Sequence, residues 1–302
     1  MSHKNHHYTF QILQINELER SYAAARAKGV EVRAMVVINP GNPTGNVLTR
    51  GNIEDVVRFC ARKGIVLIAD EVYQANIWNS NKEFTSFKRV AVEMNLLDPK
   101  KSETVVPGGL QLASMHSTSK GFVGECGRRG GYLEVCGFDA GVRGELYKLA
   151  SLFLCSNTTG QIMMGLQCQP PKAGDVSFPM YEKERLDILS SLSRRALQLN
   201  KALSAMEGAS CQPVEGALYA FPQITLPKKA VEAASQQKKA VDVFYCLELL
   251  DHTGIVVVPG SGFGQKENTF HFRSTILPPE KDMDAITEKL LVFHKGFMKK
   301  YS

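Results

Sequence analysis

The sequence lacks the features that mark membrane, secreted and zinc-binding proteins. No apolar run in its 302 residues approaches the roughly 20 residues that a membrane-spanning helix needs. Its seven cysteines lie far apart with no Cys-x-x-Cys pair, which argues against a disulfide framework or a zinc site. The N-terminal stretch has no hydrophobic signal segment and no Arg-rich amphipathic pattern, and its His3, His6 and His7 are more typical of an unstructured terminus than of a metal site. We therefore expect no membrane partner and no metal, and a cytoplasmic location, or a mitochondrial one if an upstream targeting segment is missing.

Clustered positive charge is also missing, although the net charge is +6. Lysine and arginine are dispersed along the chain, and the densest basic stretch, residues 228–239, is typical of a solvated helix face. A nucleic-acid surface would need a continuous basic stripe or interleaved aromatic residues. We therefore expect small anionic substrates and no nucleic acid.

The first part of the chain alternates apolar strands with amphipathic helices. The continuous apolar run at 34–38 predicts a strand buried on both faces, and 65–69 predicts the next buried strand. Further strands are expected at 112–116 and 131–135. Between the first two, Thr49 is a plausible N-cap, apolar residues recur with helical spacing, and Gly64 ends the helix. This order predicts the α/β class with a mostly parallel sheet and helices on its faces.

The remainder predicts a smaller α+β domain. It contains a long helix at 181–206, helices near 241–250 and 281–297, and strands near 216–221, 255–258 and 269–274. We place the boundary at the Pro-Pro break near residue 171, which gives a large domain at 1–172 and a small C-terminal domain at 173–302.

Polar side chains follow three of the predicted strands of the first domain. Asn42 lies in the turn Asn39-Pro-Gly-Asn-Pro-Thr-Gly45, Asp70 ends the second strand, and Lys120 lies in the bend Ser117-Thr-Ser-Lys. Ligands of parallel sheets bind outside the carboxyl ends of the strands, so one pocket can hold all three. An amide, a carboxylate and an amine suit a phosphorylated aromatic aldehyde that is held by its ring and captured at its carbonyl.

Each of these residues also has an ordinary structural interpretation. Asp70 can cap the next helix while Tyr73 packs, and Lys120 can be a surface lysine in a Ser-rich loop. Arg128 and Arg129, in a Gly-rich turn, can bind a phosphate or stay solvated. Arg273 alternates with Phe270 and Phe272 on a strand, where it can enter a pocket or pair with an acid of the sheet.

Taken together, the motifs resemble a known family. Asn-Pro-x-Asn-Pro-Thr-Gly, Asp-x-x-Tyr, Ser-x-x-Lys, Arg-x-Gly-Tyr and a late Phe-Arg occur in the order typical of class I/II aminotransferases. Longer strings, such as His116-Ser-Thr-Ser-Lys-Gly121 and Val257-Val-Pro-Gly-Ser-Gly-Phe-Gly-Gln265, resemble alanine aminotransferases. The resemblance covers nearly the whole chain from about residue 16. It implies the fold of type I enzymes that depend on pyridoxal 5'-phosphate (PLP).

The resemblance also implies roles for the matching residues. Lys120 would form the Schiff base and move protons, and Asp70 would pair with the pyridine nitrogen. Asn42 and Tyr73 would contact the ring's phenolic oxygen. The implied reaction is L-alanine + 2-oxoglutarate to pyruvate + L-glutamate, and the implied assembly is a homodimer.

The phosphate and carboxylate contacts follow from the same comparison. Ser117 and Arg129 would bind the phosphate, and Arg273 would bind the α-carboxylate of the substrate. The usual spacing from the lysine favours Arg128 in place of Arg129, whereas the Arg-x-Gly-Tyr match favours Arg129.

The chain differs from the family in its N-terminal part. Only 38 residues precede Asn39, whereas the family has a longer portion there that contributes to the cofactor and substrate sites. We therefore expect an N-terminally truncated chain with an incomplete large domain. Two alternatives stay open, namely a catalytically inactive homologue that acts through dimerisation, and an aminotransferase of another amino acid or of glyoxylate.

Overall fold

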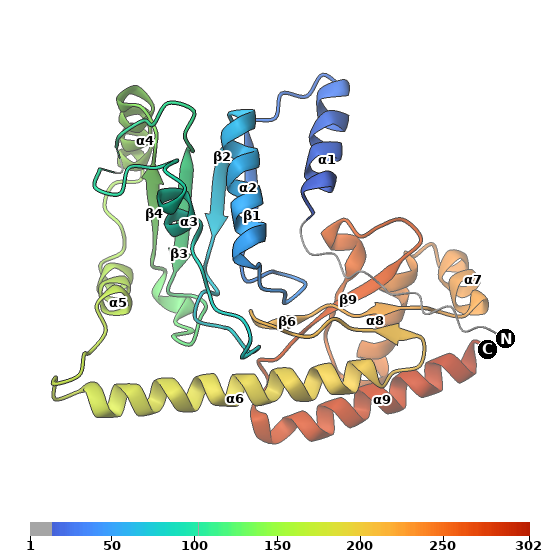
Figure 1. Cartoon of the computed structure of the whole chain (residues 1–302). Coiled ribbons are helices and arrows are strands. Elements are labelled where there is room, and N and C mark those ends of the chain that lie inside the picture. Colours follow the sequence, from blue (N-terminus) through green and yellow to red (C-terminus); the bar gives the residue numbers. More distant parts are fainter. Residues whose placement is uncertain (1–13, 102) are drawn as a thin grey trace.

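The structure of the chain is a computed structural model in which residues 14–101 and 103–302 are described. The expectation about His3, His6 and His7 falls outside these residues. A mixed α/β unit leads into a long helix that runs along the base of the molecule, and the C-terminal elements gather beside it (Figure 1).

A four-stranded sheet forms the centre of the first unit. Its order follows the chain: β1 (Ala34–Ile38), β2 (Val66–Asp70), β3 (Leu112–Ser117) and β4 (Gly131–Cys136). The first three strands are parallel, and β4 is antiparallel to β3. All four begin and end within one residue of the predicted bounds. The predicted α/β class with a mostly parallel sheet is confirmed.

Helices cover one face of this sheet. The helix α2 (Arg50–Lys63) packs against α3 (Phe87–Glu93), and α1 (Ile15–Ala27) lies against α2. Local sequence sets the ends of α2, because Thr49 accepts a hydrogen bond from Asn52 N at its start and Gly64 adopts φ 63° after its last residue. Between these ends the apolar residues point into a core shared with the sheet.

The opposite face of the sheet is open, which corrects one prediction. Val36 is 61% exposed, Met115 42% and Leu133 55%, so β1 is buried on one face only. Within residues 14–101 and 103–302, no helix covers these three side chains. The helix α5 (Thr158–Cys168) packs against β4, and α4 (Ala140–Leu152) precedes it in the chain.

The C-terminal part contains a second, antiparallel sheet. Its strands are β5 (Ala209–Ser210), β6 (Tyr219–Ala220), β7 (Gln223–Ile224), β8 (Val258–Pro259) and β9 (Phe270–Thr275). Its helices are α6 (Phe178–Ser204), α7 (Lys228–Gln236), α8 (Val241–Thr253) and α9 (Met283–Lys300). The predicted strand at 255–258 is wrong over most of its length, because β9 pairs only with Val258 and Pro259.

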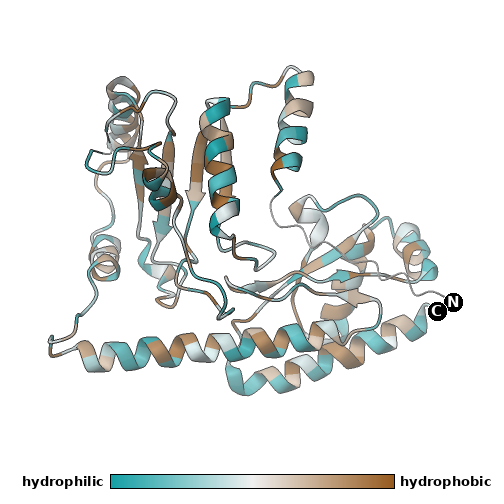
Figure 2. Cartoon of the chain, viewed as in Figure 1, coloured by the Kyte–Doolittle hydropathy of each residue, from teal (hydrophilic) through white to brown (hydrophobic). Residues whose placement is uncertain are grey.

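The described residues form two hydrophobic cores. One lies between the parallel sheet and α2 and α3, and the other between the antiparallel sheet, α6, α8 and α9. Figure 2 shows the amphipathic pattern behind this division, with hydrophobic and hydrophilic residues interspersed along α6 and brown residues on the strands. Val72 and Tyr73, which follow β2, are buried in the second core, so the chain links the two at that point. The domain boundary near residue 172 stays a prediction.

Candidate functional site

The segments that follow β1, β2 and β3 lie together at one edge of the parallel sheet. Asn39 N donates to Asp70 O (3.0 Å), which joins the first segment to the second. Glu71 N donates to Met115 O (3.2 Å), which joins the second to the third. The segments that carry Asn42, Asp70 and Lys120 therefore follow adjacent strands, and the pocket that would hold all three stays a prediction.

The turn that carries Asn42 is tightly closed. Gly41 N donates to Asn46 O (2.9 Å), and Gly45 N donates to Gly41 O (3.0 Å). Asn39 Oδ1 accepts from Leu48 N (3.0 Å) and braces the turn from inside. Gly45 has φ 69°, and a Cβ there would lie 2.5 Å from Tyr219 O, so this position requires glycine.

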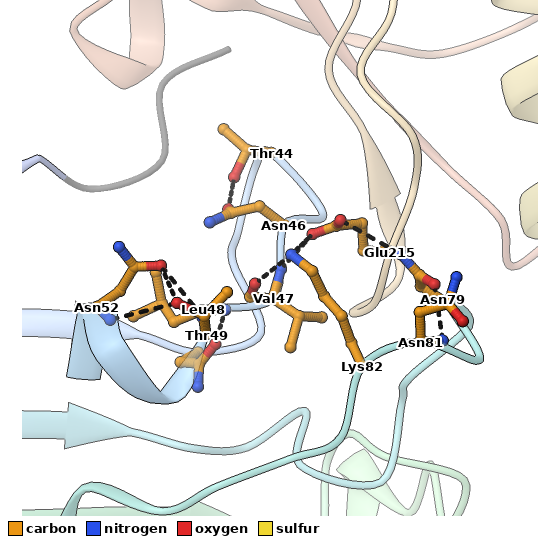
Figure 3. Close-up of polar contacts among 11 residues, drawn as sticks. Thr44, Asn46, Val47, Leu48, Thr49, Asn52, Asn79, Asn81, Lys82 and Glu215 are labelled. Atoms are coloured by element: carbon orange, nitrogen blue, oxygen red, sulfur yellow. Dashed lines mark hydrogen bonds and ion pairs between the residues drawn. The ribbon is translucent and has the colours of Figure 1, made fainter. Parts of the chain in front are cut away.

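A charged clamp fixes the same turn from outside (Figure 3). Glu215 Oε2 accepts from Val47 N (3.0 Å) and from Lys82 Nζ (2.6 Å). Lys82 Nζ also donates to Val47 O (2.8 Å). Because Glu215 N donates to Gly45 O (2.9 Å), this C-terminal segment holds the turn through both backbone and side chain.

Asp70 and Tyr73 occupy the end of β2. Asp70 Oδ1 accepts from Val72 N (3.2 Å), and Asp70 forms no ion pair with any residue that the structure describes. Tyr73 is buried, and its hydroxyl donates to Tyr219 Oη (3.1 Å). Burial, and then this hydrogen bond, raise the pKa of Tyr73, so its phenol stays protonated at neutral pH. The structural interpretation of Tyr73 as a packing residue is therefore also correct.

The Ser117–Lys120 bend is held by the Gly-rich segment after it. Thr118 donates to Gly130 O through its backbone N (3.0 Å) and its Oγ1 (3.2 Å). Ser117 Oγ accepts from Ser119 N (3.3 Å). The half-buried Lys120 has no carboxylate partner within residues 14–101 and 103–302.

The two adjacent arginines differ in their partners. Arg128 Nε lies 3.5 Å from Glu125 Oε2, whereas Arg129 Nη1 donates to Cys126 O (3.0 Å) and pairs with no acid in the described residues. Both are exposed, and neither hydrogen-bonds to Ser117. Only Arg129 keeps its charge unpaired, and the phosphate role of either arginine stays a prediction.

Arg273 reaches the site from β9 of the second sheet. Its Nη1 donates to Asn42 Oδ1 (3.0 Å), a contact between residues 231 positions apart. Its guanidinium lies 4.5 Å from the ring centroid of Tyr219 and 5.0 Å from that of Phe263. The expectation that Arg273 lies on the face opposite Phe272 agrees with the burial of Phe272, whereas the contact with Asn42 was not predicted. The carboxylate role of Arg273 stays a prediction.

Tyr219 and Phe263 are the residues that sequence reasoning missed. The string Gly216-Ala-Leu-Tyr219 indicates only a short strand, and Phe263 lies in the 3₁₀ turn Gly260–Phe263. The signal for Tyr219 was its pairing: it lies opposite Thr275, two residues from Arg273 and on the same face of the sheet. That register depends on the pairing of β6 with β9, which no local sequence pattern specifies.

A cavity also lies outside the site. A cavity of about 620 Å³ lies between α8 and α9 and is lined by Phe293, Phe297, Glu248 and Lys300 among others. None of the seven predicted site residues lines it.

The side chains fit a phosphorylated pyridine aldehyde by their chemistry. Asp70 provides an uncompensated carboxylate for a protonated ring nitrogen, and Lys120 an unpaired amine for a carbonyl. Asn42 and Tyr73 provide an amide and a neutral phenol for a ring oxygen. Arg129 and Arg273 provide guanidinium groups that no described acid neutralises.

Comparison with known proteins finds aminotransferases among the relatives of this chain. The family model "Aminotransferase class I and II" matches residues 5–290. The chain is 53% identical over 289 residues to alanine aminotransferase 2 of Panicum miliaceum, covering 96% of this chain and 58% of that protein. It is 51% identical over 294 residues to a probable mitochondrial alanine aminotransferase of Dictyostelium discoideum, covering 96% and 53%. It is also 47% identical to glutamate–glyoxylate aminotransferase 2 of Arabidopsis thaliana, covering 96% and 59%.

The chain thus spans a little over half the length of the curated relatives it matches. Among solved structures, alanine aminotransferase from Pyrococcus furiosus superposes with a TM-score of 0.70 at 23% identity, over 94% of this chain and 61% of that one. This likeness confirms the predicted fold, that of type I PLP-dependent enzymes. On the family match and these identities, the chain belongs to the class I and II aminotransferases, a PLP-dependent family.

Proposed function

We propose that this chain belongs to an alanine aminotransferase that converts L-alanine and 2-oxoglutarate to pyruvate and L-glutamate with PLP. The observation that carries the proposal is the arrangement of Asn42, Asp70 and Lys120 after three adjacent strands, with Arg273 hydrogen-bonded to Asn42. Similarity to alanine aminotransferases of a plant and a slime mould supports it.

The cofactor would be held by side chains from both sheets. When bound, PLP supplies an electron sink for the carbanion that forms at the substrate's α-carbon. Asp70 would keep the pyridine nitrogen protonated, and Asn42 and Tyr73 would bind the ring oxygen. Ser117 and Arg129 would bind the phosphate.

The substrate would be bound and deprotonated by two residues. Arg273 would hold the α-carboxylate in fork-to-fork geometry, with its guanidinium already oriented by Asn42 and by two aromatic rings. Lys120 would hold the cofactor through its amine, and the same amine would move the proton of the substrate's α-carbon. The unpaired state of Lys120 in the described residues favours this role over that of a surface ion pair.

The assembly and location are part of the same proposal. We expect a homodimer, because the family is dimeric, and a division into a large domain at 1–172 and a small domain at 173–302. We expect a cytoplasmic location, or a mitochondrial one as in the Dictyostelium relative. Within the described residues, no helix has the length and apolar character needed to span a bilayer.

The test removes the amine of Lys120 and uses the replacement of another lysine as a control. The purified chain is incubated with PLP, L-alanine and 2-oxoglutarate, and pyruvate and the visible cofactor absorbance are recorded. Lys120→Ala should abolish both, whereas Lys201→Ala, an exposed change on α6, should leave both intact. Equal absorbance in the wild type and Lys120→Ala would contradict the role of Lys120.

Two other functions are each favoured by one observation. Similarity to glutamate–glyoxylate aminotransferases favours glyoxylate as the 2-oxo acid, which the same assay tests by replacing 2-oxoglutarate. The open apolar face of the parallel sheet favours an inactive protein that associates with a longer relative. Pyruvate formation by the purified chain would exclude this second function.

A further inference from the structure

Tyr219 touches two residues of the site with two different parts of its side chain. Its ring lies under the guanidinium of Arg273, 4.5 Å from the carbon of that group. Its hydroxyl is hydrogen-bonded to that of Tyr73 (3.1 Å), and the two rings meet edge to face at 5.9 Å. Tyr219 is itself buried, with 8% of its surface exposed, so it cannot simply rotate into solvent.

The backbone of Tyr219 is fixed from both sides. It pairs with Thr275 in β9, and its carbonyl oxygen lies against Gly45 of the Asn42 turn. The preceding residues are also tied down, because Trp78 Nε1 donates to Ala217 O (2.9 Å) and Gly216 N to Gly45 O (2.8 Å). The side chain therefore leaves a rigid frame that both sheets share.

The ring contact restricts Arg273. An aromatic face attracts a guanidinium that lies flat against it, and a second face, that of Phe263, lies 5.0 Å from the same group. With Nη1 bonded to Asn42, the remaining N–H groups keep a fixed orientation. A bidentate bond to a carboxylate depends on that orientation.

The hydroxyl contact restricts Tyr73. In the structure without ligands, Tyr73 donates to Tyr219. Because a hydroxyl proton can rotate and a phenol oxygen can also accept, Tyr73 can donate to a ligand oxygen while it accepts a hydrogen bond from Tyr219. Such chains of hydrogen bonds strengthen one another in a buried site. Without the hydroxyl of Tyr219, Tyr73 would lose this neighbour in the second core.

We propose that Tyr219 is a positioning residue, whose ring orients Arg273 for a carboxylate and whose hydroxyl orients Tyr73 for the oxygen of the cofactor ring. The identity of the two ligands rests on the proposed function. The two contacts themselves are properties of this chain without ligands, and they are testable separately.

Two variants separate the ring from the hydroxyl. Tyr219→Phe keeps the ring and removes the hydroxyl, whereas Tyr219→Leu removes both. Tyr147→Phe, an exposed tyrosine on α4, is the matched control. The first readout needs no cofactor: in crystal structures of the ligand-free variants, Arg273 should keep its bond to Asn42 in Tyr219→Phe and leave it in Tyr219→Leu.

The second readout is the binding of ligands. Tyr219→Phe should weaken PLP binding about 3- to 10-fold, the size expected for one lost hydrogen bond, with the KM for L-alanine unchanged. Tyr219→Leu should in addition raise the KM for L-alanine roughly 10-fold, whereas Tyr219→Phe, which keeps the ring, should have the KM of the wild type. A general packing defect would shift both constants in both variants.

The outcomes separate failure of this inference from failure of the proposed function. If Arg273 stays on Asn42 in the ligand-free Tyr219→Leu structure, the positioning role is wrong, whatever the chain catalyses. The role of the hydroxyl is also refuted if the changes in the free energy of unfolding caused by Tyr73→Phe and by Tyr219→Phe add up to the change measured in the double variant. If the chain binds no PLP but both structural results are as expected, the proposed function fails and the positioning role stands.

Discussion

Glu71 is the buried titratable group whose behaviour the structure predicts most sharply. Only 7% of its surface is exposed, and its Oε1 accepts from Phe87 N (2.8 Å) at the start of α3. Burial raises its pKa from 4.5 to about 7, the bond from Phe87 opposes this, and the charges of Asp70 and Glu134 add to it. Folded protein near neutral pH therefore carries a partly protonated carboxyl in this position.

The sign of the effect on stability follows from this raised pKa. Between pH 4.5 and about 7 the folded chain binds more protons at Glu71 than the unfolded chain does, so the free energy of unfolding falls as pH rises. This shift in the pKa corresponds to a decrease of about 3 kcal/mol in the free energy of unfolding, which is complete by about pH 8. Glu71→Gln, which mimics the protonated form and still accepts from Phe87, removes this contribution.

We expect Glu71→Gln to be more stable than the wild type by about 3 kcal/mol at about pH 8 and nearly equal to it at about pH 4.5. Urea unfolding followed by circular dichroism at several pH values measures this, with Glu232→Gln, an exposed change on α7, as the control. Parallel pH profiles for wild type and Glu71→Gln would refute the reasoning, because other titrating groups are common to both.

Three further predictions concern capping, acid stability and thiols. Thr49→Ala should lower the free energy of unfolding by about 1 kcal/mol, since the start of α2 loses its cap, and Thr49→Ser should restore it; equal stability of all three would contradict the cap. Burial lowers the pKa of His294, whose Nδ1 lies 2.9 Å from Tyr245 Oη. Below about pH 6.5 the free energy of unfolding, measured by urea titration, should therefore fall more steeply with decreasing pH in the wild type than in His294→Gln. Equal decreases in the two proteins would contradict this prediction. A thiol reagent should react fast with the exposed cysteines, Cys126, Cys155 and Cys168, and slowly with the buried ones. Early labelling of the buried cysteines, detected by mass spectrometry, would contradict their burial.

Much of the first sheet was predictable because its signals are local. The cap at Thr49, the left-handed Gly64 and the apolar runs predict α2 and its flanking strands within one residue. Exposure was less predictable, because Val36 looks like a buried strand residue whether or not anything covers it. An apolar run encodes strand formation, and what packs on it depends on other segments.

The candidate site also has a part that could be predicted from the sequence and a part that could not. The positions of Asn42, Asp70 and Lys120 follow from strand order, which the alternating pattern indicates. The bond from Arg273 to Asn42 and the position of Tyr219 depend on contacts between segments far apart in the chain. Such contacts arise from the packing of two cores and leave no periodic trace in the sequence.

The close fit between the Asn42 turn and residues 215–219 restricts how this chain can be recombined with its relatives. A Cβ at Gly45 would lie 2.5 Å from Tyr219 O, and one at Gly216 would lie 2.8 Å from Val47 Cγ2 and 3.1 Å from Pro40 Cβ. A hybrid enzyme whose crossover falls between these segments joins a turn from one parent to a support from the other. The natural exchange unit is therefore the turn together with its distant support, and a crossover at residue 172, which looks neutral in the linear sequence, cuts through it.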